Sequence, residues 1–364
     1  MNQLFPLPIY TFLKIAIKNG GFSIKRLKNI VLWMVKLVLL EPLRWVELAT
    51  QQKRINRHVI NVDPVFILGF YRSGTSYLHE FITQDERFGY HTNFQMVFPE
   101  IMLSCEKWLS PSFDFIFRLF KIFDPVHRVP LSFRFPGEED GAMTTALNPR
   151  GAGWGYFFPK KMMDYFHKFV LFENMPNAEI EAWARDYIFL LKKISIASES
   201  KPLVLKSPPN TARIKLLLTI FPNAKFIFIH RNPYEVYASN KKFLQVTHGF
   251  YAVGGTKSID FNQIILDTYT QTMQRYVQEK DLIPAGHLIE LVYDDFVKAP
   301  VANLKKVYEA LNLNDFSICE AKMSAFAARQ KTFSSLQHHL PEEERRVATE
   351  KLEPFLRRWN YPLQ

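Results

Sequence analysis

Residues 65–78 constrain the fold more than any other stretch, because an apolar run there enters a short polar loop that opens a helix-compatible segment. The run Val65–Leu68 is followed by the loop 69–74, and Thr75 begins the segment with helical character. The first backbone N–H groups of a helix lack intrahelical partners and carry partial positive charge, so a loop of small residues that feeds a helix presents several donors to an anion. The stretch therefore predicts a strand, an anion-binding loop and a helix.

The loop departs from a nucleotide triphosphatase loop in one informative position. Gly69 and Gly74 have the P-loop spacing, but Thr75 stands where such an enzyme carries lysine. Arg72 supplies a cation from inside the loop instead, and a planar guanidinium suits a bidentate grip on phosphate or sulfate oxygens. Gly74 permits a close approach of the backbone, and Thr75 and Ser76 add hydroxyl donors. A strand, turn and helix without a ligand is the alternative that this segment alone leaves open.

A second segment, 224–239, repeats the strand-to-helix layout. Phe226–Ile229 reads as a buried strand, and Pro233 suits the first turn of a helix. Arg231 then stands at the carboxyl end of the strand, and Ser239 follows about two helical turns later. Ligands of open α/β sheets bind at that edge, so the segment predicts a second anion site.

On these two segments the chain resembles the PAPS-dependent sulfotransferases, in particular the broad, largely bacterial branch that uses an Arg-Ser-Gly-Thr loop. The resemblance implies that the first segment is the 5′-phosphosulfate loop and the second the 3′-phosphate site. Two weaker matches, Leu203–Pro208 and Leu291–Phe296, extend it from residue 65 to about 300 in the expected order. The residues that the resemblance assigns to PAPS binding are Arg72, Ser73, Gly74, Thr75, Ser76, Tyr77, Arg231 and Ser239.

The resemblance further implies transfer of a sulfuryl group from PAPS to a hydroxyl, without a metal. Charge builds on the bridging and equatorial oxygens in such a transfer, so nearby cations and donors lower the barrier. We expect Arg72 to stabilise the leaving 5′-phosphate and Lys206 to neutralise the sulfuryl oxygens. Alternatively, Lys206 is an ordinary solvated lysine at the surface end of a strand. The better-known cytosolic branch carries lysine in place of Arg72, so its catalytic details do not transfer to this chain.

The acceptor hydroxyl needs a general base. Glu138, Glu139 and Asp140 resemble an acidic motif that recurs in this branch, and burial among aromatic rings can raise the pKa of a carboxyl group toward neutrality. His91 is the alternative, because related sulfotransferases place a catalytic side chain soon after the first helix. We prefer Glu139, although the acidic trio also fits a helix amino terminus stabilised by negative charge.

Strands that alternate with helices predict a P-loop-like, three-layer α/β/α fold with a central parallel sheet. We expect an α/β domain over residues 61–330 and a loop and helix over 331–364. A mainly helical insertion, 91–200, holds fourteen phenylalanines between His91 and Pro176. Most of these rings should form core, but aromatic and methionine-rich walls also accommodate apolar ligands, so we expect the acceptor site there and an apolar acceptor such as a sterol or lipid.

Composition fits a globular enzyme, with 48% hydrophobic and 22% charged residues. The net charge of +11 suits a polyanionic nucleotide donor or an acidic membrane surface as well as nucleic acid, and no nucleic-acid motif accompanies it. Only two cysteines are present, which favours a reducing, cytoplasmic compartment over a disulfide framework. The spacing of histidines and cysteines gives no support to a structural metal. Nothing in the sequence indicates the oligomeric state.

The amino-terminal region, 1–60, has a character of its own. The run Ile30–Leu40 is apolar apart from Lys36 and follows several basic residues, but it is shorter than the roughly 20 apolar residues that a membrane-spanning helix needs. A helix docked on the core and an interfacial helix with peripheral membrane contact through residues 20–47 both fit this pattern.

Three other functions remain open on the sequence. A P-loop nucleotide kinase or triphosphatase fits less well, because no lysine follows Gly74 and no aspartate ends the strand 226–229 to organise Mg²⁺. A sulfotransferase that acts on carbohydrate would keep the donor site but change the acceptor. A non-catalytic lipid-surface protein that retains a nucleotide fold is a further alternative.

Overall fold

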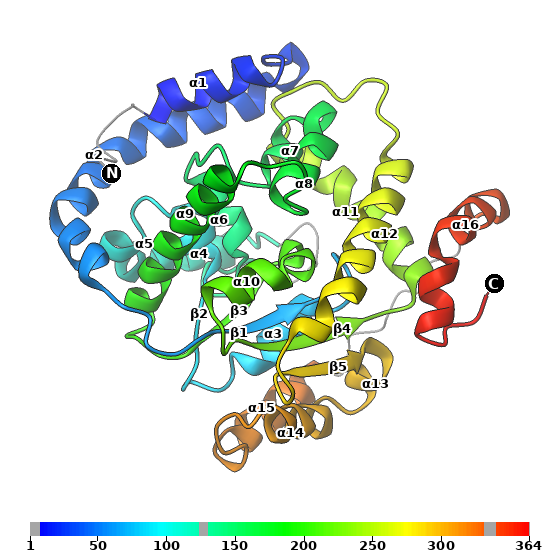
Figure 1. The fold of residues 1–364 in the computed structure, drawn as a ribbon. Coiled ribbons are helices and arrows are strands. Elements are labelled where there is room, and N and C mark those ends of the chain that lie inside the picture. Colours follow the sequence, from blue (N-terminus) through cyan, green and yellow to red (C-terminus); the bar gives the residue numbers. More distant parts are fainter. Residues whose placement is uncertain (1–7, 124–129, 331–339, 364) are drawn as a thin grey trace. The chain divides into compact units, whose positions relative to one another are not determined.

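The computed structural model describes residues 8–123, 130–330 and 340–363. The chain divides into two compact units. Figure 1 shows the fold, coloured along the sequence from the amino to the carboxyl terminus. Unit 1 comprises residues 1–60, 91–197 and 243–260, and unit 2 comprises residues 61–90, 198–242 and 261–364.

Unit 2 contains a sheet of five parallel strands in the order β2-β3-β1-β4-β5. β1 lies in the middle, where Ile67 pairs with Lys206 of β3 and with Ile227 of β4. The α/β class with a central parallel sheet, predicted from the sequence, is therefore confirmed. The strands are β1 (Val65–Leu68), β2 (Gly89–Tyr90), β3 (Leu203–Lys206), β4 (Lys225–His230) and β5 (Leu288–Val292).

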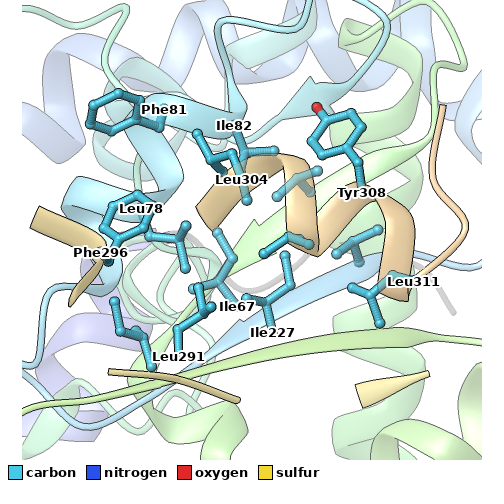
Figure 2. Packing of buried hydrophobic residues seen from close by; sticks show 14 of the residues in the cluster. Ile67, Leu78, Phe81, Ile82, Ile227, Leu291, Phe296, Leu304, Tyr308 and Leu311 are labelled. Carbon is cyan, nitrogen blue, oxygen red and sulfur yellow. The ribbon is translucent and has the colours of Figure 1, made fainter. Parts of the chain in front are cut away.

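Alternate residues of the strands face opposite sides of this sheet. One face buries Ile67 and Ile227 beneath helices α3 and α14, and Figure 2 shows Leu78, Phe81 and Leu304 pointing into the same cluster. Burying these side chains contributes roughly 1.5–3 kcal/mol each. The helices on or near this face are α3 (Thr75–Ile82), α13 (Tyr293–Lys298), α14 (Pro300–Ala310) and α15 (Ser317–Arg329).

The opposite face of the sheet is aromatic. Phe66 stacks on Phe226 with 5.7 Å between ring centroids, and Phe228 stacks on Tyr276 of α12 at 3.7 Å. The sheet is thus covered by helices on both sides, as a parallel sheet requires. The remaining helical elements of unit 2 are η3 (Pro208–Ala212), α10 (Ile214–Ile220), the first part of α11 (Pro233–Tyr251), α12 (Phe261–Glu279), η4 (Lys280–Leu282) and α16 (Glu342–Arg358).

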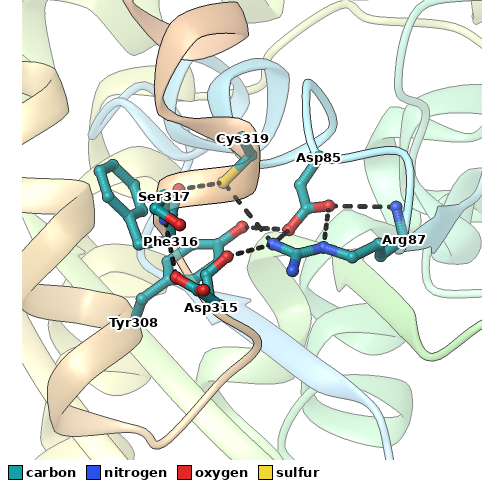
Figure 3. A network of polar contacts seen from close by, with 7 residues as sticks. All are labelled: Asp85, Arg87, Tyr308, Asp315, Phe316, Ser317 and Cys319. Atoms are coloured by element: carbon teal, nitrogen blue, oxygen red, sulfur yellow. Dashed lines mark hydrogen bonds and ion pairs between the residues drawn. The ribbon is translucent and has the colours of Figure 1, made fainter.

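A buried polar network fixes α14 and α15 to the turn that follows α3 (Figure 3). The carboxylate of Asp85 accepts hydrogen bonds from Arg87 at 2.8 Å and from the hydroxyl of Tyr308 at 2.9 Å. Arg87 also donates to the carbonyl of Asp315 at 2.7 Å and approaches the Sγ of Cys319. Burial raises the pKa of Asp85, but the hydrogen bonds from Arg87 and Tyr308 outweigh it and lower that pKa overall. The network therefore holds a buried charge in a fully paired arrangement, which is the condition for its stability.

Unit 1 is built from helices around aromatic clusters. Phe133 is enclosed by the rings of Phe94, Phe98, Phe113 and Phe117, with centroid distances between 5.1 and 5.8 Å. Most of these pairs meet edge to face, which is a favoured geometry for aromatic rings. The helical elements are α1 (Pro8–Lys18), η1 (Ile24–Arg26), α2 (Leu27–Arg57), α4 (Asn93–Val97), α5 (Met102–Leu119), α6 (Glu139–Thr145), α7 (Trp154–Phe157), η2 (Pro159–Lys161), α8 (Met162–Phe169), α9 (Asn177–Ala197) and the last part of α11.

A buried ion pair joins three helices of unit 1. Glu47 of α2 lies 2.6 Å from the Nζ of Lys193 on α9. The same carboxylate accepts hydrogen bonds from the backbone N–H groups of Leu103 and Ser104, both at 3.0 Å, at the start of α5. Negative charge at a helix amino terminus is stabilising, so Glu47 fixes α2 against α5 as well as against α9.

Candidate active site

The loop between β1 and α3 has a conformation that requires its two glycines. Gly69 has φ +147° and Gly74 has φ +100°, both unfavourable for residues with a Cβ atom. A Cβ on Gly69 would lie 2.5 Å from the carbonyl oxygen of Ile229, and one on Gly74 would lie 2.3 Å from the ring of Tyr293. Arg72 itself has φ +69°. The loop is therefore pressed closely against β4 and the start of α13.

Hydroxyl groups hold the loop in this conformation. The N–H of Gly69 donates to the Oγ1 of Thr211 at 2.8 Å, and that hydroxyl donates to the carbonyl of Gly69 at 3.1 Å. The hydroxyl of Ser73 donates to the carbonyl of Phe70 at 2.7 Å. α3 then begins at Thr75, and the first backbone N–H groups of a helix are not used within it. The loop thus delivers a helix amino terminus to the carboxyl edge of β1.

The two segments singled out in the sequence meet at Arg72. Its Nε donates to the hydroxyl of Ser239 at 3.0 Å, across 167 positions of the chain. One residue further along α11, the side-chain amide of Asn240 donates to the carbonyl of Tyr71 at 2.9 Å. The β1–α3 loop and α11 are therefore joined at two consecutive positions, with an arginine and a serine in direct contact.

Arg231 lies directly after β4, on the same edge of the sheet. Its guanidinium carbon is 4.7 Å from the centroid of the Tyr293 ring, a cation–π arrangement, and its Nη2 is 3.2 Å from the carboxylate of Glu235. Burial raises the pKa of Tyr293, against the opposing effects of Arg231 and Arg72. Tyr293 therefore contributes a neutral ring that touches both the loop, at Gly74, and the second arginine.

Lys206 is the last residue of β3, and its side chain is buried, with 3% of the residue exposed. Ser207, Asn210 and Thr211, which follow it, are fully buried as well. A buried ammonium group is costly unless polar groups surround it. Lys206 is thus different from the solvated strand-end lysine that the sequence also allowed.

Three cations consequently stand at the ends of three neighbouring strands: Lys206 at β3, Arg72 after β1 and Arg231 after β4. Parallel strands share one carboxyl edge, so these groups gather on the same side of the sheet. Their charge, together with the amino terminus of α3, suits an anionic ligand with more than one phosphate or sulfate group.

Thr75, Ser76 and Tyr77 form the first turn of α3. The ring of Tyr77 packs edge to face against Phe81 and Phe296, with centroid distances of 5.0 and 5.7 Å. Because its side chain belongs to the core cluster, Tyr77 can serve an anion chiefly through its backbone N–H.

The candidates for the general base lie in unit 1. The N–H of Gly137 donates to the carbonyl of His91 at 2.7 Å, and Thr92 and Pro136 form an antiparallel bridge. The strand-like pair brings the backbone of His91 beside the chain that leads into the acidic trio, Glu138–Asp140. His91 is fully buried.

Within the trio, Glu139 differs from its neighbours in its surroundings. It opens α6, is fully buried, and accepts a hydrogen bond from the hydroxyl of Tyr187 on α9 at 3.0 Å. Asp140 is also buried, whereas Glu138 occupies the position before the helix and makes no side-chain cap bond there. A carboxylate held by a tyrosine has a defined orientation, which a general base requires.

Several residues of this arrangement escaped the sequence analysis. Thr211, Asn240 and Tyr187 belong to no recognised motif, because each acts through a contact with a distant segment. Tyr293 stood in one of the weaker matches, so its position carried a signal, but its contact with Gly74 and Arg231 did not follow from it.

Comparison with known proteins adds an independent observation. A sequence model of the sulfotransferase family matches residues 64–317. Two curated relatives, the omega-hydroxy-beta-dihydromenaquinone-9 sulfotransferases Stf3 of Mycobacterium bovis and Mycobacterium tuberculosis, are each 26% identical over 315 residues, which cover 85% of this chain and 78% of theirs.

Two solved structures share the fold. Sulfotransferase STF9 from Mycobacterium avium superimposes with a TM-score of 0.69 and 18% identity, covering 86% of this chain and 81% of that one. Sulfotransferase STF1 from Mycobacterium tuberculosis superimposes with a TM-score of 0.66 and 16% identity, covering 95% of this chain and 91% of that one. At these identities the likeness concerns the fold alone.

Proposed function

Because the chain belongs to the sulfotransferase family and is therefore a sulfotransferase, we propose that it moves the sulfuryl group of PAPS to the hydroxyl of an apolar acceptor such as a sterol or another lipid. The observation that supports the donor most directly is the hydrogen bond between Arg72 and Ser239. It joins the loop expected to hold the 5′-phosphosulfate with the helix expected to hold the 3′-phosphate. A ligand that carries both groups on one nucleoside fits two anion sites in such proximity.

Each cation has a separate task in this proposal. Arg72 and the N–H groups of residues 73–77 stabilise the 5′-phosphate, while Arg231 and Ser239 bind the 3′-phosphate. Lys206 neutralises the sulfuryl oxygens. The Nε bond to Ser239 and the stacking of Arg231 on Tyr293 orient the two guanidinium groups before the ligand arrives, which lowers the cost of binding.

The chemistry is a displacement at sulfur. The acceptor oxygen forms a bond to the sulfur while the bond between that sulfur and the 5′-phosphate oxygen breaks, and 3′,5′-bisphosphorylated adenosine leaves. Negative charge grows on the leaving phosphate, where preorganised donors contribute most. The acceptor proton passes to a base, for which we propose Glu139, held by Tyr187.

Two observations support an apolar acceptor. The curated relatives are named for a hydroxylated menaquinone, a lipid. Unit 1 also supplies many phenylalanine and methionine side chains, which suit apolar ligands of irregular shape. A sugar would need a polar cleft instead.

Calorimetric titration with 3′,5′-bisphosphorylated adenosine tests the donor site. ATP serves as the control ligand, EDTA is present throughout, and the ATP titration is repeated with Mg²⁺. We expect tight, metal-independent binding that ATP does not match, and we expect Arg231→Ala to weaken it by about tenfold or more, since a charged phosphate contact is lost. A preference for ATP that depends on Mg²⁺ would contradict the proposal and favour a P-loop kinase.

An acceptor screen with labelled PAPS then tests the acceptor class. Sterols and hydroxylated isoprenoid lipids are compared with soluble glycans at equal hydroxyl concentration. Sulfation of the lipids supports the proposal, whereas a clear preference for the glycans would refute the apolar acceptor while leaving the donor site intact.

A further inference from the structure

The amino-terminal helices of unit 1 expose an apolar surface that the transfer reaction does not explain. From Leu27 to Val46 the exposed side chains of α2 are almost all apolar, and Lys28 is the one charged residue among them. Val31, Val35 and Leu39 repeat at intervals of four residues, so they form one stripe along the helix. Leu39 is 67% exposed. At about 1.5 Å per residue the stripe is about 12 Å long, and the whole stretch from Leu27 to Val46 is about 28 Å long.

This stripe is not the face by which α2 packs against the core of unit 1, because a second face of the helix is buried there. Leu37 is buried, and Leu40 packs against the phenylalanine cluster around Phe133. The pair between Glu47 and Lys193 and the bonds from the start of α5 anchor the helix further. α2 is therefore docked on unit 1 with one apolar face and presents another outward.

α1 repeats the pattern. It lies beside α2 (Figure 1) and buries Phe12, while Tyr10, Leu13 and Ile17 are exposed along one face. Ile24, which begins η1 between the two helices, is at 88% the most exposed of these side chains.

α5, which contacts α2, has an aromatic version of the same surface. Trp108, Phe115, Leu119 and Phe120 are each more than half exposed. We call the outward side chains of α1, of α2 as far as Val46 and of α5 the basic apolar surface.

The exposed charges on this surface, as distinct from the half-buried Glu41 and Glu106, are all positive. No aspartate or glutamate occurs before Glu41, whereas this stretch contains six basic residues. Lys14, Lys18, Lys25 and Lys28 are exposed and form no ion pair within the described ranges 8–123, 130–330 and 340–363. On α5 the exposed charges are again cations, Lys107 and Arg118, and the exposed Lys121 follows the end of the helix.

We propose that the basic apolar surface binds the headgroup region of an anionic lipid bilayer. Valine, leucine, tryptophan and phenylalanine side chains would enter the boundary between headgroups and acyl chains, and the lysines would meet the lipid phosphates. In the described part of the chain no helix is long and apolar enough to cross a membrane, so the contact is peripheral. A second protein would need complementary acidic groups, whereas a bilayer supplies apolar depth and negative charge together. The inference rests on these helices and not on the proposed reaction.

Co-sedimentation of the full chain with vesicles tests the proposal. Vesicles of phosphatidylcholine alone are compared with vesicles of equal parts phosphatidylcholine and phosphatidylglycerol, at low and at high salt. We expect strong binding to the anionic vesicles, weaker binding to the neutral ones, and a decrease with salt because exposed charges are screened.

Two sets of substitutions separate the helices of the surface. The first set is Val31→Gln, Val35→Gln and Leu39→Gln on α2, and the second is Phe115→Gln and Leu119→Gln on α5. Glutamine keeps helix propensity but removes apolar contact with lipid. We expect each set to reduce the bound fraction at least about tenfold, since binding scales with the apolar area inserted.

Matched controls place the same changes in unit 2. Ile318→Gln on α15 and Val347→Gln on α16 also alter exposed apolar side chains and should leave vesicle binding unchanged. Lys25→Glu with Lys28→Glu should weaken binding to anionic vesicles about tenfold or more. Reversing Lys305 and Lys306 of α14, which changes the net charge equally, should not.

The outcomes distinguish this surface from a protein interface and from the donor site. Failure of the wild-type chain to bind anionic vesicles at low salt overturns the proposal, as does equal binding by all variants. So does a dimer in light scattering that the α2 substitutions dissociate, if vesicles are not bound. Titration with 3′,5′-bisphosphorylated adenosine is performed on every variant, and unchanged affinity shows that the protein is folded and that the donor site is independent.

Discussion

The two units place their functional groups by different physical means. In unit 2 the cations Lys206, Arg72 and Arg231 stand at or after the carboxyl ends of three neighbouring strands of a parallel sheet, so the backbone topology brings them to one edge. In unit 1 the buried carboxylate of Glu139 is held by Tyr187, which comes from another helix 48 positions away. The proposed donor site therefore depends on short local motifs, whereas the proposed general base depends on how side chains from different helices pack.

The largest effect that would test this contrast is on the proposed base. Glu139→Gln keeps the shape of the side chain and removes its basicity, so we expect kcat to fall by about 10³ while the affinity for 3′,5′-bisphosphorylated adenosine stays unchanged. Steady-state kinetics and calorimetry measure the two quantities on the same preparation.

Glu138→Gln is the matched control, because it alters the neighbouring carboxylate outside the buried position. His91→Gln is measured in parallel. If Glu139→Gln remains active and His91→Gln is inactive with normal donor binding, the base is His91 and the preference for Glu139 is wrong.

The next effect concerns the loop of unit 2. Arg72→Ala removes the guanidinium that we assign to the leaving phosphate, and we expect kcat to fall by about 10² or more, as for other preorganised groups that stabilise developing charge. Arg185→Ala on α9 removes an exposed arginine and should leave kcat unaltered. Wild-type kinetics in Arg72→Ala would show that the loop does not contact the reacting phosphosulfate.

A third test separates two contributions to the loss of stability: the cost of a left-handed backbone conformation and the cost of steric crowding. Gly74→Ala introduces a Cβ at positive φ that also meets the Tyr293 ring, whereas Gly286→Ala has φ +78° with no heavy atom within 4 Å. We expect Gly286→Ala to lower the free energy of unfolding by about 1 kcal/mol through the left-handed conformation. Gly74→Ala should cost about 2 kcal/mol more and weaken binding of the bisphosphate. Equal losses in urea denaturation would mean that Tyr293 moves aside easily.

The smallest expected effect is a loss of stability at acidic pH, to which one buried histidine in each unit contributes. Burial lowers the pKa of His230 in unit 2 to about 4, and burial with the nearby Arg26 does the same for His248 in unit 1. Below pH 6.5 these side chains bind a proton in the unfolded chain but not in the folded one, so their stabilisation is complete above 6.5 and is lost as the pH falls toward 4. We expect a loss of about 1 kcal/mol per histidine at pH 5.5.

Urea denaturation at pH 7.5 and 5.5 measures this loss. His230 stacks on Trp359 at 4.9 Å, so His230→Phe retains a ring there without a titratable group and should reduce the pH dependence by about half. If the pH dependence of the free energy of unfolding is unchanged in His230→Phe, groups other than His230 cause the loss of stability at pH 5.5.

Much of unit 2 was predictable because its signals are local. The apolar run before Gly69, the helix-compatible residues after it and the repeat of this layout around Arg231 all lie within about fifteen residues, so strand, loop and helix followed from the sequence. The aromatic insertion was predicted to be mainly helical, and the described elements within residues 93–197 are helices apart from short bridges. The roles of the individual site residues stay predictions.

What lay outside prediction has a common cause. Three contacts join segments that lie more than a hundred residues apart in the sequence. They are the contact of Tyr293 with Gly74, the hydrogen bond from the side-chain amide of Asn240 to the carbonyl of Tyr71, and the hydrogen bonds between Thr211 and Gly69. No local pattern specifies such a pair, because the same side chain in the same local sequence serves equally well elsewhere. For the amino-terminal helices, a helix docked on the core and an interfacial helix predict the same apolar pattern in the sequence. Only the burial of each side chain distinguishes the docked face from the outward one.

The sequence by itself determined that this chain would build a parallel α/β sheet with an arginine-bearing loop between a strand and a helix, because strand periodicity, glycine spacing and residue order along the chain are local properties. The tertiary structure alone decided that Arg72 touches Ser239, that Glu139 is buried against Tyr187, and that α2 turns one apolar face inward and one outward. These outcomes depend on the close packing of distant segments, where contact distances of a few ångströms select one partner among many with the same chemistry.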